Sequence, residues 1–176
     1  MATLSRTEIE SALRRLGELA KQEQEQIQLV VVGGAVMLLV YQARLTTRDV
    51  DAVILSPRST ATVRKWVKQV AHELDLPEEW LNDGAKGYLI GLSQGPTVFS
   101  APGIEARAPS LAQLLAMKLS AWRDETDIDD ARRLLQEIGG EREKDWNEIE
   151  PYLVPGRELK AKYAFLDLWE SLYGAD

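Results

Sequence analysis

The sequence predicts an α/β (α+β) protein in which a small mixed β-sheet with flanking helices precedes a helical C-terminal half. Two short runs rich in β-branched residues, Ile27–Val32 and Val50–Leu55, have the length and composition of buried strands. Apolar residues at helical spacing surround these runs, and after Pro109 every patterned segment is helical. We therefore expect an α/β core with an N-terminal helix over residues 1–108, and a helical region packed on that core over residues 109–176.

The first part of the chain alternates between helical and extended patterns. Apolar residues three and four positions apart, such as Ile9, Leu13 and Leu16, indicate a helix. Gly33-Gly34 ends the first strand, and Ser56-Pro57 ends the second. In chain order, the expected elements are a helix from Ser5 to about Gln22, a strand at 27–32, a helix that contains Val36 and Ala43, a strand at 50–55 and a helix at 60–74.

The middle of the chain, residues 76–103, contains many glycines and prolines and therefore predicts short strands joined by turns. We expect strands near Tyr88–Leu92 and Thr97–Phe99, and a last strand at Ile104–Arg107. The remaining expected elements are helices at 109–122, 126–138, 144–150 and 157–173.

The composition excludes several classes of site. The absence of cysteine rules out disulfides, thiolate zinc sites and cysteine nucleophiles, and the single histidine, His72, cannot form a multi-histidine metal site. The net charge of −7 argues against a broad surface that binds a nucleic-acid backbone. The basic stretch from Arg58 to Lys68 is either a solvated helix face or a local basic patch.

The N-terminus lacks the apolar segment of a signal peptide, and the longest apolar run, Leu29–Tyr41, is shorter than the roughly 20 residues of a membrane span. We expect a soluble, cytoplasmic protein.

The most informative segment joins a glycine turn to a pair of acids. Gly33-Gly34 follows the first strand, and Asp49 and Asp51 follow after fourteen residues, at the start of the second strand. Because alternate residues of a strand point to the same side, the two carboxylates share a face, about 7 Å apart. Two carboxylates at this spacing suit a pair of Mg²⁺ ions. The glycines, which have no Cβ, allow a phosphate to approach the backbone.

Each half of this motif has an ordinary explanation when taken alone. A glycine pair after a strand is commonly just a turn, and an Asp-x-Asp is commonly two acids that face solvent. The order of the residues distinguishes this motif from the Asp-x-Asp of another enzyme class. In phosphatases of the haloacid-dehalogenase type the Asp-x-Asp follows the apolar strand, whereas Asp49 and Asp51 begin theirs. This class of phosphatase is therefore not expected.

Two charged residues in the helical half also stand out. Lys118 lies within an apolar helical stripe, so its ammonium either extends to solvent or meets an anion such as a phosphate. Asp127 follows Thr126, which is a suitable N-cap, so a favourable helix-dipole position explains it. Asp127 also shares an inward face with Ala131 and Leu134, which makes pairing with Lys118 an equal alternative.

Together these residues resemble the polymerase-β-like nucleotidyltransferase superfamily. The pattern of that superfamily is a strand that ends in Gly-Gly or Gly-Ser, a helix, and a strand with Asp-hydrophobic-Asp; here Val32–Ala35 and Leu45–Asp51 match it. The closest resemblance is to the small bacterial branch, which includes the nucleotidyltransferase toxins of abortive-infection-type toxin–antitoxin systems. Segments 79–83 and 114–130 are also similar to that branch, and the resemblance covers residues 27–138.

The resemblance implies a role for each matching residue. Gly33 and Gly34 would hold the phosphates of a nucleoside triphosphate (NTP), and Asp49 and Asp51 would hold Mg²⁺ or Mn²⁺. Lys118 and Asp127 match the lysine and the acid of the downstream helices and would join the catalytic set. The superfamily's third carboxylate has no clear match, and Glu105 is the best candidate.

The resemblance also implies partners but leaves their choice open. Arg44 and Arg48 flank the acids. Each of them either binds the triphosphate or forms a surface salt bridge. The acceptor of the nucleotide would be a transfer RNA (tRNA), a protein side chain or a small molecule, and a toxin would have a cognate antitoxin. The alternative is a catalytically silent binding module, for example an antitoxin or a regulatory partner that keeps the fold.

Overall fold

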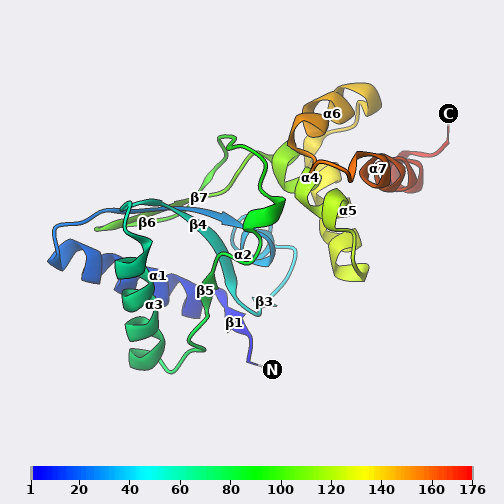
Figure 1. Cartoon of the computed structure of the whole chain (residues 1–176). Coiled ribbons are helices and arrows are strands. Elements are labelled where there is room, and N and C mark those ends of the chain that lie inside the picture. The colour runs from blue at the N-terminus through cyan, green and yellow to red at the C-terminus, as the bar shows by residue number, and fades with distance from the viewer. Residues whose placement is uncertain (1, 176) are drawn as a thin grey trace. The chain divides into compact units, whose positions relative to one another are not determined.

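A computed structural model describes residues 2–175 (Figure 1). The chain forms two compact units. The sheet unit comprises the described part of Met1–Lys86 together with Gln94–Ala108, and the helical unit comprises Gly87–Ser93 with the described part of Pro109–Asp176. The units are therefore not two continuous ranges that meet at residue 108, since a short segment before that point groups with the helices. Within residues 2–175, no helix combines the length and apolar composition that a membrane span requires.

The sheet unit contains a five-stranded mixed sheet with the strand order β5-β4-β2-β7-β6. The central strand β2 runs antiparallel to β4 and parallel to β7, and the short β5 runs parallel to β4. A separate two-stranded ribbon pairs β1 with β3. In chain order the elements are β1 (Leu4–Ser5), α1 (Arg6–Gln22), β2 (Ile27–Val32), α2 (Gly34–Leu39), β3 (Thr46–Thr47), β4 (Val50–Ser56), α3 (Thr60–Glu73), β5 (Leu81–Asn82), β6 (Thr97–Ala101) and β7 (Ile104–Arg107).

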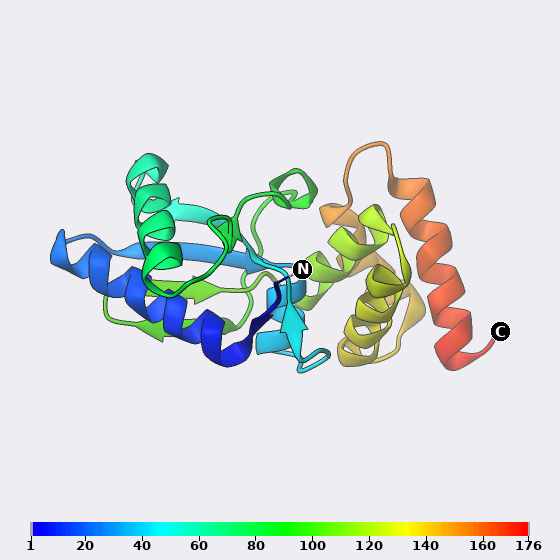
Figure 2. The same ribbon diagram turned by 90° about the horizontal axis from the view of Figure 1, so that it is seen from below.

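Helices α1 and α3 cover one face of the sheet (Figure 2). Helix α1 begins with a capping box, in which Ser5 and Glu8 exchange side-chain and backbone hydrogen bonds. Gly17 brings α1 close to β7, because a Cβ atom at position 17 would lie 2.6 Å from Cγ2 of Ile104. The strand register pairs Ile104 with Ile27, so Ile27 and the alternate residues of β2 point toward α1.

The same register places Asp51 on the opposite face of the sheet. Asp51 pairs with Val32, which lies an odd number of residues after Ile27, and strand residues directly opposite each other share a face. Gln28, which points to this face by the same alternation, is exposed. The acidic strand therefore presents Asp51 on the face that α1 and α3 do not cover.

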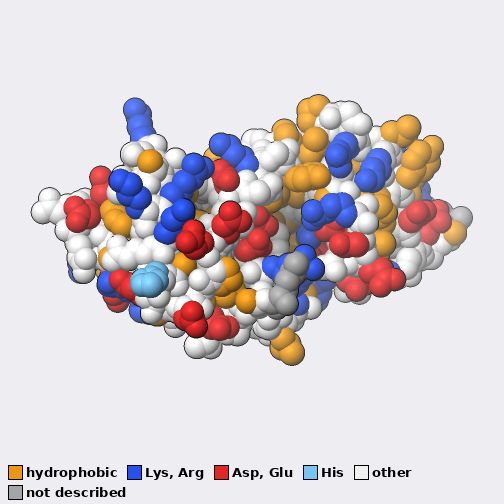
Figure 3. All heavy atoms as spheres, turned by 60° about the horizontal axis from the view of Figure 1, so that its bottom comes forward, with side chains coloured by type: hydrophobic (Ala, Val, Ile, Leu, Met, Phe, Trp, Pro, Cys, Tyr) orange, Lys and Arg blue, Asp and Glu red, His pale blue; other side chains and the backbone are white. Residues whose placement is uncertain are grey.

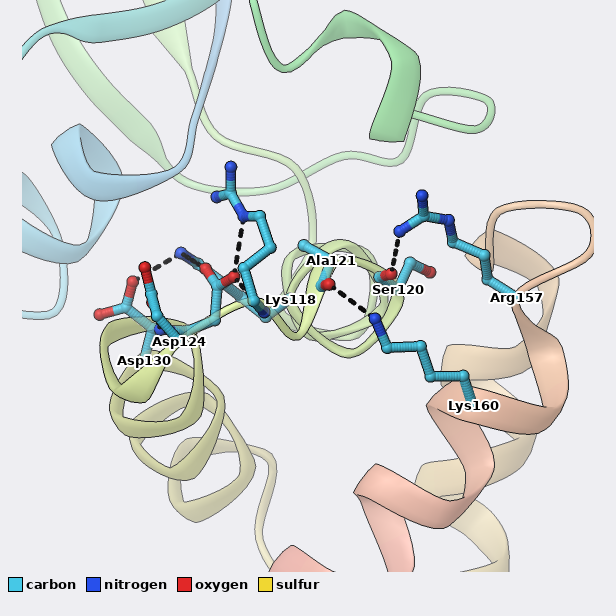
Figure 4. A network of polar contacts seen from close by, with 9 residues as sticks. Lys118, Ser120, Ala121, Asp124, Asp130, Arg157 and Lys160 are labelled. Carbon is cyan, nitrogen blue, oxygen red and sulfur yellow. Dashed lines mark hydrogen bonds and ion pairs between the residues drawn. The ribbon is translucent and has the colours of Figure 1, made fainter.

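The helical unit is built around α4 (Leu111–Ala121), which is buried along most of its length and packs against the other three long helices. Its C-terminal carbonyl groups are capped by two cations of the same unit: Arg157 donates to the Ser120 oxygen at 2.9 Å, and Lys160 donates to the Ala121 oxygen at 3.0 Å (Figure 4). The remaining elements are the 3₁₀ turn Lys86–Tyr88, α5 (Glu125–Ile138), α6 (Arg142–Ile149), the 3₁₀ turn Glu150–Tyr152 and α7 (Glu158–Tyr173).

Gln113 of α4 holds the segment Gly87–Ser93 in the helical unit. Its amide nitrogen donates to the carbonyl oxygens of Ile90 and Gly91 at 2.9 and 3.0 Å, and its amide oxygen accepts from the Ser93 backbone N–H at 2.9 Å. The predicted strand near Tyr88–Leu92 is therefore wrong. The backbone groups that would join a sheet instead bind the side chain of a fully buried glutamine.

Candidate functional site

The two acids of the motif lie at the start of β4. Asp51 pairs with Val32 of β2 on one side and with Asn82 of β5 on the other, while Asp49 immediately precedes the strand. The Thr47 hydroxyl donates to the backbone oxygen of Asp49 at 3.3 Å, which fixes the chain just before the strand. Both aspartates are half-buried.

Glycines surround the carboxylate of Asp51. Gly33 has φ +67°, a conformation that strongly favours glycine, and a Cβ atom there would lie 3.3 Å from Oδ2 of Asp51. A Cβ atom at Gly84 would lie 3.4 Å from the other oxygen, Oδ1. The carboxylate thus lies between two stretches of backbone that carry no side chain, which leaves room for a ligand to approach the main chain.

Gly34 makes room for two polar side chains instead. A Cβ atom at this position would lie 2.6 Å from the Thr47 hydroxyl oxygen and 2.8 Å from a guanidinium nitrogen of Arg44. Arg44 is half-buried at the glycine turn, whereas Arg48, the predicted phosphate ligand, is exposed. Of the two arginines that flank the acids, Arg44 is therefore the one that contacts the turn.

Asn82 orients Asp49. Its amide nitrogen donates to Oδ2 of Asp49 at 3.0 Å and to the Glu79 backbone oxygen at 3.3 Å, while its amide oxygen accepts from the Gly84 N–H at 2.8 Å. The sequence interpretation gave Asn82 no role. Strand β5 has only two residues, which is too short for any periodicity to mark it.

The structure does not bring Glu105, the predicted third carboxylate, to the acidic pair. In the parallel pairing of β2 and β7, Glu105 is level with Gln28, whereas Asp51 is level with Val32. Four residues of strand separate these positions, about 13 Å at the usual rise. The Glu105 carboxylate instead forms an ion pair with Arg107 at 2.7 Å.

The acidic pair nevertheless has the chemistry that a hard divalent cation requires. Within residues 2–175, no group of three or more Asp, Glu, His or Cys side chains is placed to hold a metal ion. Proteins, however, commonly bind Mg²⁺ through one or two carboxylates, with substrate phosphates and water as the other ligands. Asp49 and Asp51 beside the bare backbone of Gly33 and Gly84 fit this partial ligand set.

In the helical unit, Lys118 lies between two buried aspartates (Figure 4). Its ammonium nitrogen is 2.9 Å from Oδ1 of Asp127 and 2.7 Å from Oδ2 of Asp130. The side chain of Lys118 is 14% exposed, and those of the aspartates are 2% and 4% exposed. Lys118 therefore meets anions of its own unit, and Asp130 is a partner that the sequence interpretation missed.

Asp127 accepts hydrogen bonds from several donors. The backbone N–H and the Nε atom of Arg123 donate to its Oδ2 at 3.0 and 3.1 Å, in addition to the contact with Lys118. Burial alone raises the pKa of Asp127, but the hydrogen bonds from Arg123 and Lys118 outweigh burial and lower the pKa to about 2.

The N-cap of α5 is Asp124, whose carboxylate accepts from the Asp127 N–H at 3.0 Å, so the expectation that Thr126 caps this helix was wrong.

Comparison with known families identifies the chain. The model of a family described as "Nucleotidyltransferase of unknown function (DUF6036)" matches residues 11–150, most of the chain. The chain belongs to this nucleotidyltransferase family. The matched range contains the glycine turn, the acidic pair and the Lys118 cluster (Lys118, Arg123, Asp127 and Asp130). No curated protein and no solved structure matches the chain significantly.

The surface of this nucleotidyltransferase-family protein carries interspersed charges where the sequence is most basic. Figure 3 shows acidic and basic side chains side by side on the face that contains the single histidine, His72. Two residues of the basic stretch are paired there with acids of the following loop: Arg64 lies 3.3 Å from Asp83, and Lys68 lies 3.4 Å from Glu78. The basic stretch is therefore in part neutralised by neighbouring acids.

Proposed function

We propose that this protein transfers a nucleoside monophosphate from an NTP to a hydroxyl group of an acceptor and releases pyrophosphate. Membership of the family supports nucleotidyl transfer in general. The observation that carries the proposal is the Asp51 carboxylate, which lies against the bare backbone at Gly33, with Asp49 two residues away. A cation and a phosphate need this combination of carboxylates and accessible main chain.

In this proposal, Asp49 and Asp51 would hold Mg²⁺ or Mn²⁺. When bound, the ion would neutralise charge on the triphosphate and so favour attack at its α-phosphorus. Asn82 keeps the Asp49 carboxylate in a fixed orientation. Gly33 and Gly34 let the triphosphate approach the turn, and Arg48 would contact the phosphates from its exposed position.

The transfer is balanced without any redox partner. A bond forms between the acceptor oxygen and the α-phosphorus, and the bond from that phosphorus to the oxygen that bridges to the β-phosphorus breaks. Pyrophosphate leaves with the bonding electrons, and the proton of the acceptor hydroxyl passes to water. The chain contributes mainly by positioning and by charge complementarity, as in phosphoryl transfer generally.

The acceptor and the biological role belong to the same proposal. Candidate acceptors are the end of a tRNA, a protein side chain and a small molecule, and a toxin role would add a cognate antitoxin as partner. The net charge of −7 favours an acceptor that is held locally over one that is gripped along a long phosphate backbone. Lys118 and Asp127, which the resemblance also places in the catalytic set, remain predictions for this role.

One observation favours a second candidate function, a catalytically silent binding module. Because Glu105 is paired with Arg107 and lies away from the acids, Asp49 and Asp51 form a set of two carboxylates among the residues that the structure describes. If two are insufficient for catalysis, the site would still bind an NTP with its cation.

The substitution Asp49→Asn tests the proposal. We expect it to reduce Mg²⁺-dependent pyrophosphate release by about 10³-fold, because an amide is a weaker ligand for the Mg²⁺ that would neutralise charge in the transition state. Calorimetry with each of the four NTPs, with and without Mg²⁺, measures binding, and pyrophosphate release with each acceptor class separates the two candidates. Asp167→Asn, at an exposed position of α7, is the matched control and should behave as the unmodified protein. NTP binding without turnover for any acceptor class would favour the binding module, and no NTP binding would overturn both.

A further inference from the structure

A pocket of about 490 Å³ lies at the edge of β4 in the sheet unit. Its walls come from β4, from one face of α3 and from the loop that leads into and out of β5. We call it the β4–α3 pocket. Its volume lies in the range typical of small-molecule sites, roughly 300–1,000 Å³.

The pocket exists because β5 is shorter than its neighbour. Strand β5 pairs only with Val50 and Asp51, while β4 continues to Ser56. Among the described residues, no strand covers the edge of β4 beyond Asp51 on this side. Helix α3 passes beside this edge and leaves a space between Ile54 and Val67.

The walls of the pocket are apolar in the middle and polar at one end. Val53, Ile54, Val67 and Leu81 provide the apolar surface. At the polar end lies Asn82, which is bonded to Asp49. A ligand here would therefore meet apolar side chains along its body and an amide and a carboxylate at one end.

The charges at the rim do not favour an anion in the pocket. Arg64 and Lys68 line it from α3, but each is already paired with an acid of the loop, Asp83 or Glu78. These two ion pairs join α3 to the loop, and over the whole lining four acids (Asp49, Glu78, Glu79 and Asp83) outnumber three cations (Arg64, Lys68 and Lys86). The lining thus suits an uncharged, largely planar group with polar edges better than a phosphate.

We propose that the β4–α3 pocket binds the nucleoside part of the NTP. The inference rests on the proposed function, which places the phosphates at Asp49 and Asp51. Asp49 belongs to both sites, so a molecule with its phosphates at the acids reaches the pocket directly. The base lies against Ile54 and Val67 on the α3 side of the β4 edge, and the ribose lies toward Asn82.

Two tryptophan substitutions on α3 test the pocket. Thr60 lines the pocket at the start of the helix, whereas Thr62 is exposed and lies outside the lining. We expect Thr60→Trp to weaken binding of the preferred NTP by at least about tenfold, because the indole fills the space that the base needs. Thr62→Trp changes the same residue type on the same helix and should have no effect.

Inorganic tripolyphosphate with Mg²⁺ is the second probe in the same calorimetric experiment. It carries the phosphates without a nucleoside, so Thr60→Trp should leave its affinity unchanged. Thermal unfolding checks that each variant is folded, and Arg64→Trp at the exposed rim is the second blocking variant if Thr60→Trp is unfolded.

The outcomes separate the two proposals. If neither the NTPs nor tripolyphosphate bind the unmodified protein, the proposed function fails. If both bind and the blocking variants leave NTP affinity unchanged, only the pocket assignment is overturned. If the blocking variants spare NTP binding but abolish modification of the acceptor, the pocket holds the acceptor, and the nucleoside assignment is wrong.

Discussion

The acidic pair of the sheet unit and the Lys118 cluster of the helical unit use the same residue types in opposite ways. Asp127 and Asp130 are almost fully buried and face a cation of their own unit. Asp49 and Asp51 are half-buried at the start of one strand, next to backbone without side chains. Removing one member of a buried pair leaves an uncompensated charge in the interior, whereas half-buried acids at the start of a strand are accessible to a cation from outside.

Neutralising one acid of the pair is the most direct test of this difference between the two sites. We expect Asp51→Asn to lower Mg²⁺-dependent pyrophosphate release by about 10³-fold, as for Asp49. The free energy of unfolding should change by less than about 1 kcal/mol, because the amide keeps the shape of a half-buried side chain and can still accept hydrogen bonds. Urea unfolding measures the stability. A loss of more than about 1 kcal/mol would mean that the Asp51 charge stabilises the fold.

The corresponding change in the Lys118 cluster should have a larger effect on stability. Asp127→Ala removes the acceptor of Arg123 and one of the two acids that face Lys118, and we expect it to cost about 3 kcal/mol in urea unfolding. Asp129→Asn, on the same helix but at an exposed position, should change stability by less than about 0.5 kcal/mol. Equal effects of the two substitutions would contradict a stabilising role for the cluster.

Acid should weaken the helical unit through the same carboxylate. The pKa of Asp127 in the folded protein is about 2, below its ordinary value of 3.8, so this group binds protons more readily in the unfolded chain. Its contribution, about 2 kcal/mol, is therefore fully present above pH 4 and is lost as the pH falls from about 4 to about 2. Unfolding free energies of the unmodified protein and of Asp127→Asn, measured from pH 6 to pH 2, should converge at the acid end. Parallel curves would show that Asp127 is not the responsible group.

The smallest effect is expected at Glu105. Because its carboxylate pairs with Arg107 away from the acids, Glu105→Gln should change Mg²⁺-dependent pyrophosphate release by less than about twofold, in keeping with the small energies of surface ion pairs. A loss comparable to that of Asp49→Asn would show that Glu105 reaches the metal during turnover.

The sequence predicted the parts of the sheet unit that carry strong apolar patterns. The bounds of β2 are the predicted ones, and β4 and α3 differ by a single residue at one end. The family and the fold class were also predicted, from the glycine turn and the acidic strand, and the family comparison and the structure confirm them.

Most features that the sequence analysis missed depend on contacts between residues far apart in the chain. The distance of Glu105 from the acids follows from the register of β7 against β2, which no local pattern records. Asp124 caps α5 in place of Thr126 because its carboxylate accepts the Asp127 N–H, and both residue types are good caps by composition. Asn82 and Asp130 are visible only as neighbours of Asp49 and Lys118 in space.

The segment that Gln113 holds has a practical consequence for dissecting the molecule. Because Gly87–Ser93 belongs to the helical unit and Gln94–Ala108 returns to the sheet unit, the backbone passes from one unit to the other three times. A fragment that starts at Pro109 lacks the segment Gly87–Ser93, which hydrogen-bonds to the side-chain amide of Gln113. A fragment that stops at Ala108 contains this segment but lacks Gln113. A fragment that starts at Gly87 instead keeps both segments of the helical unit, although no single continuous fragment contains all of one unit without a segment of the other.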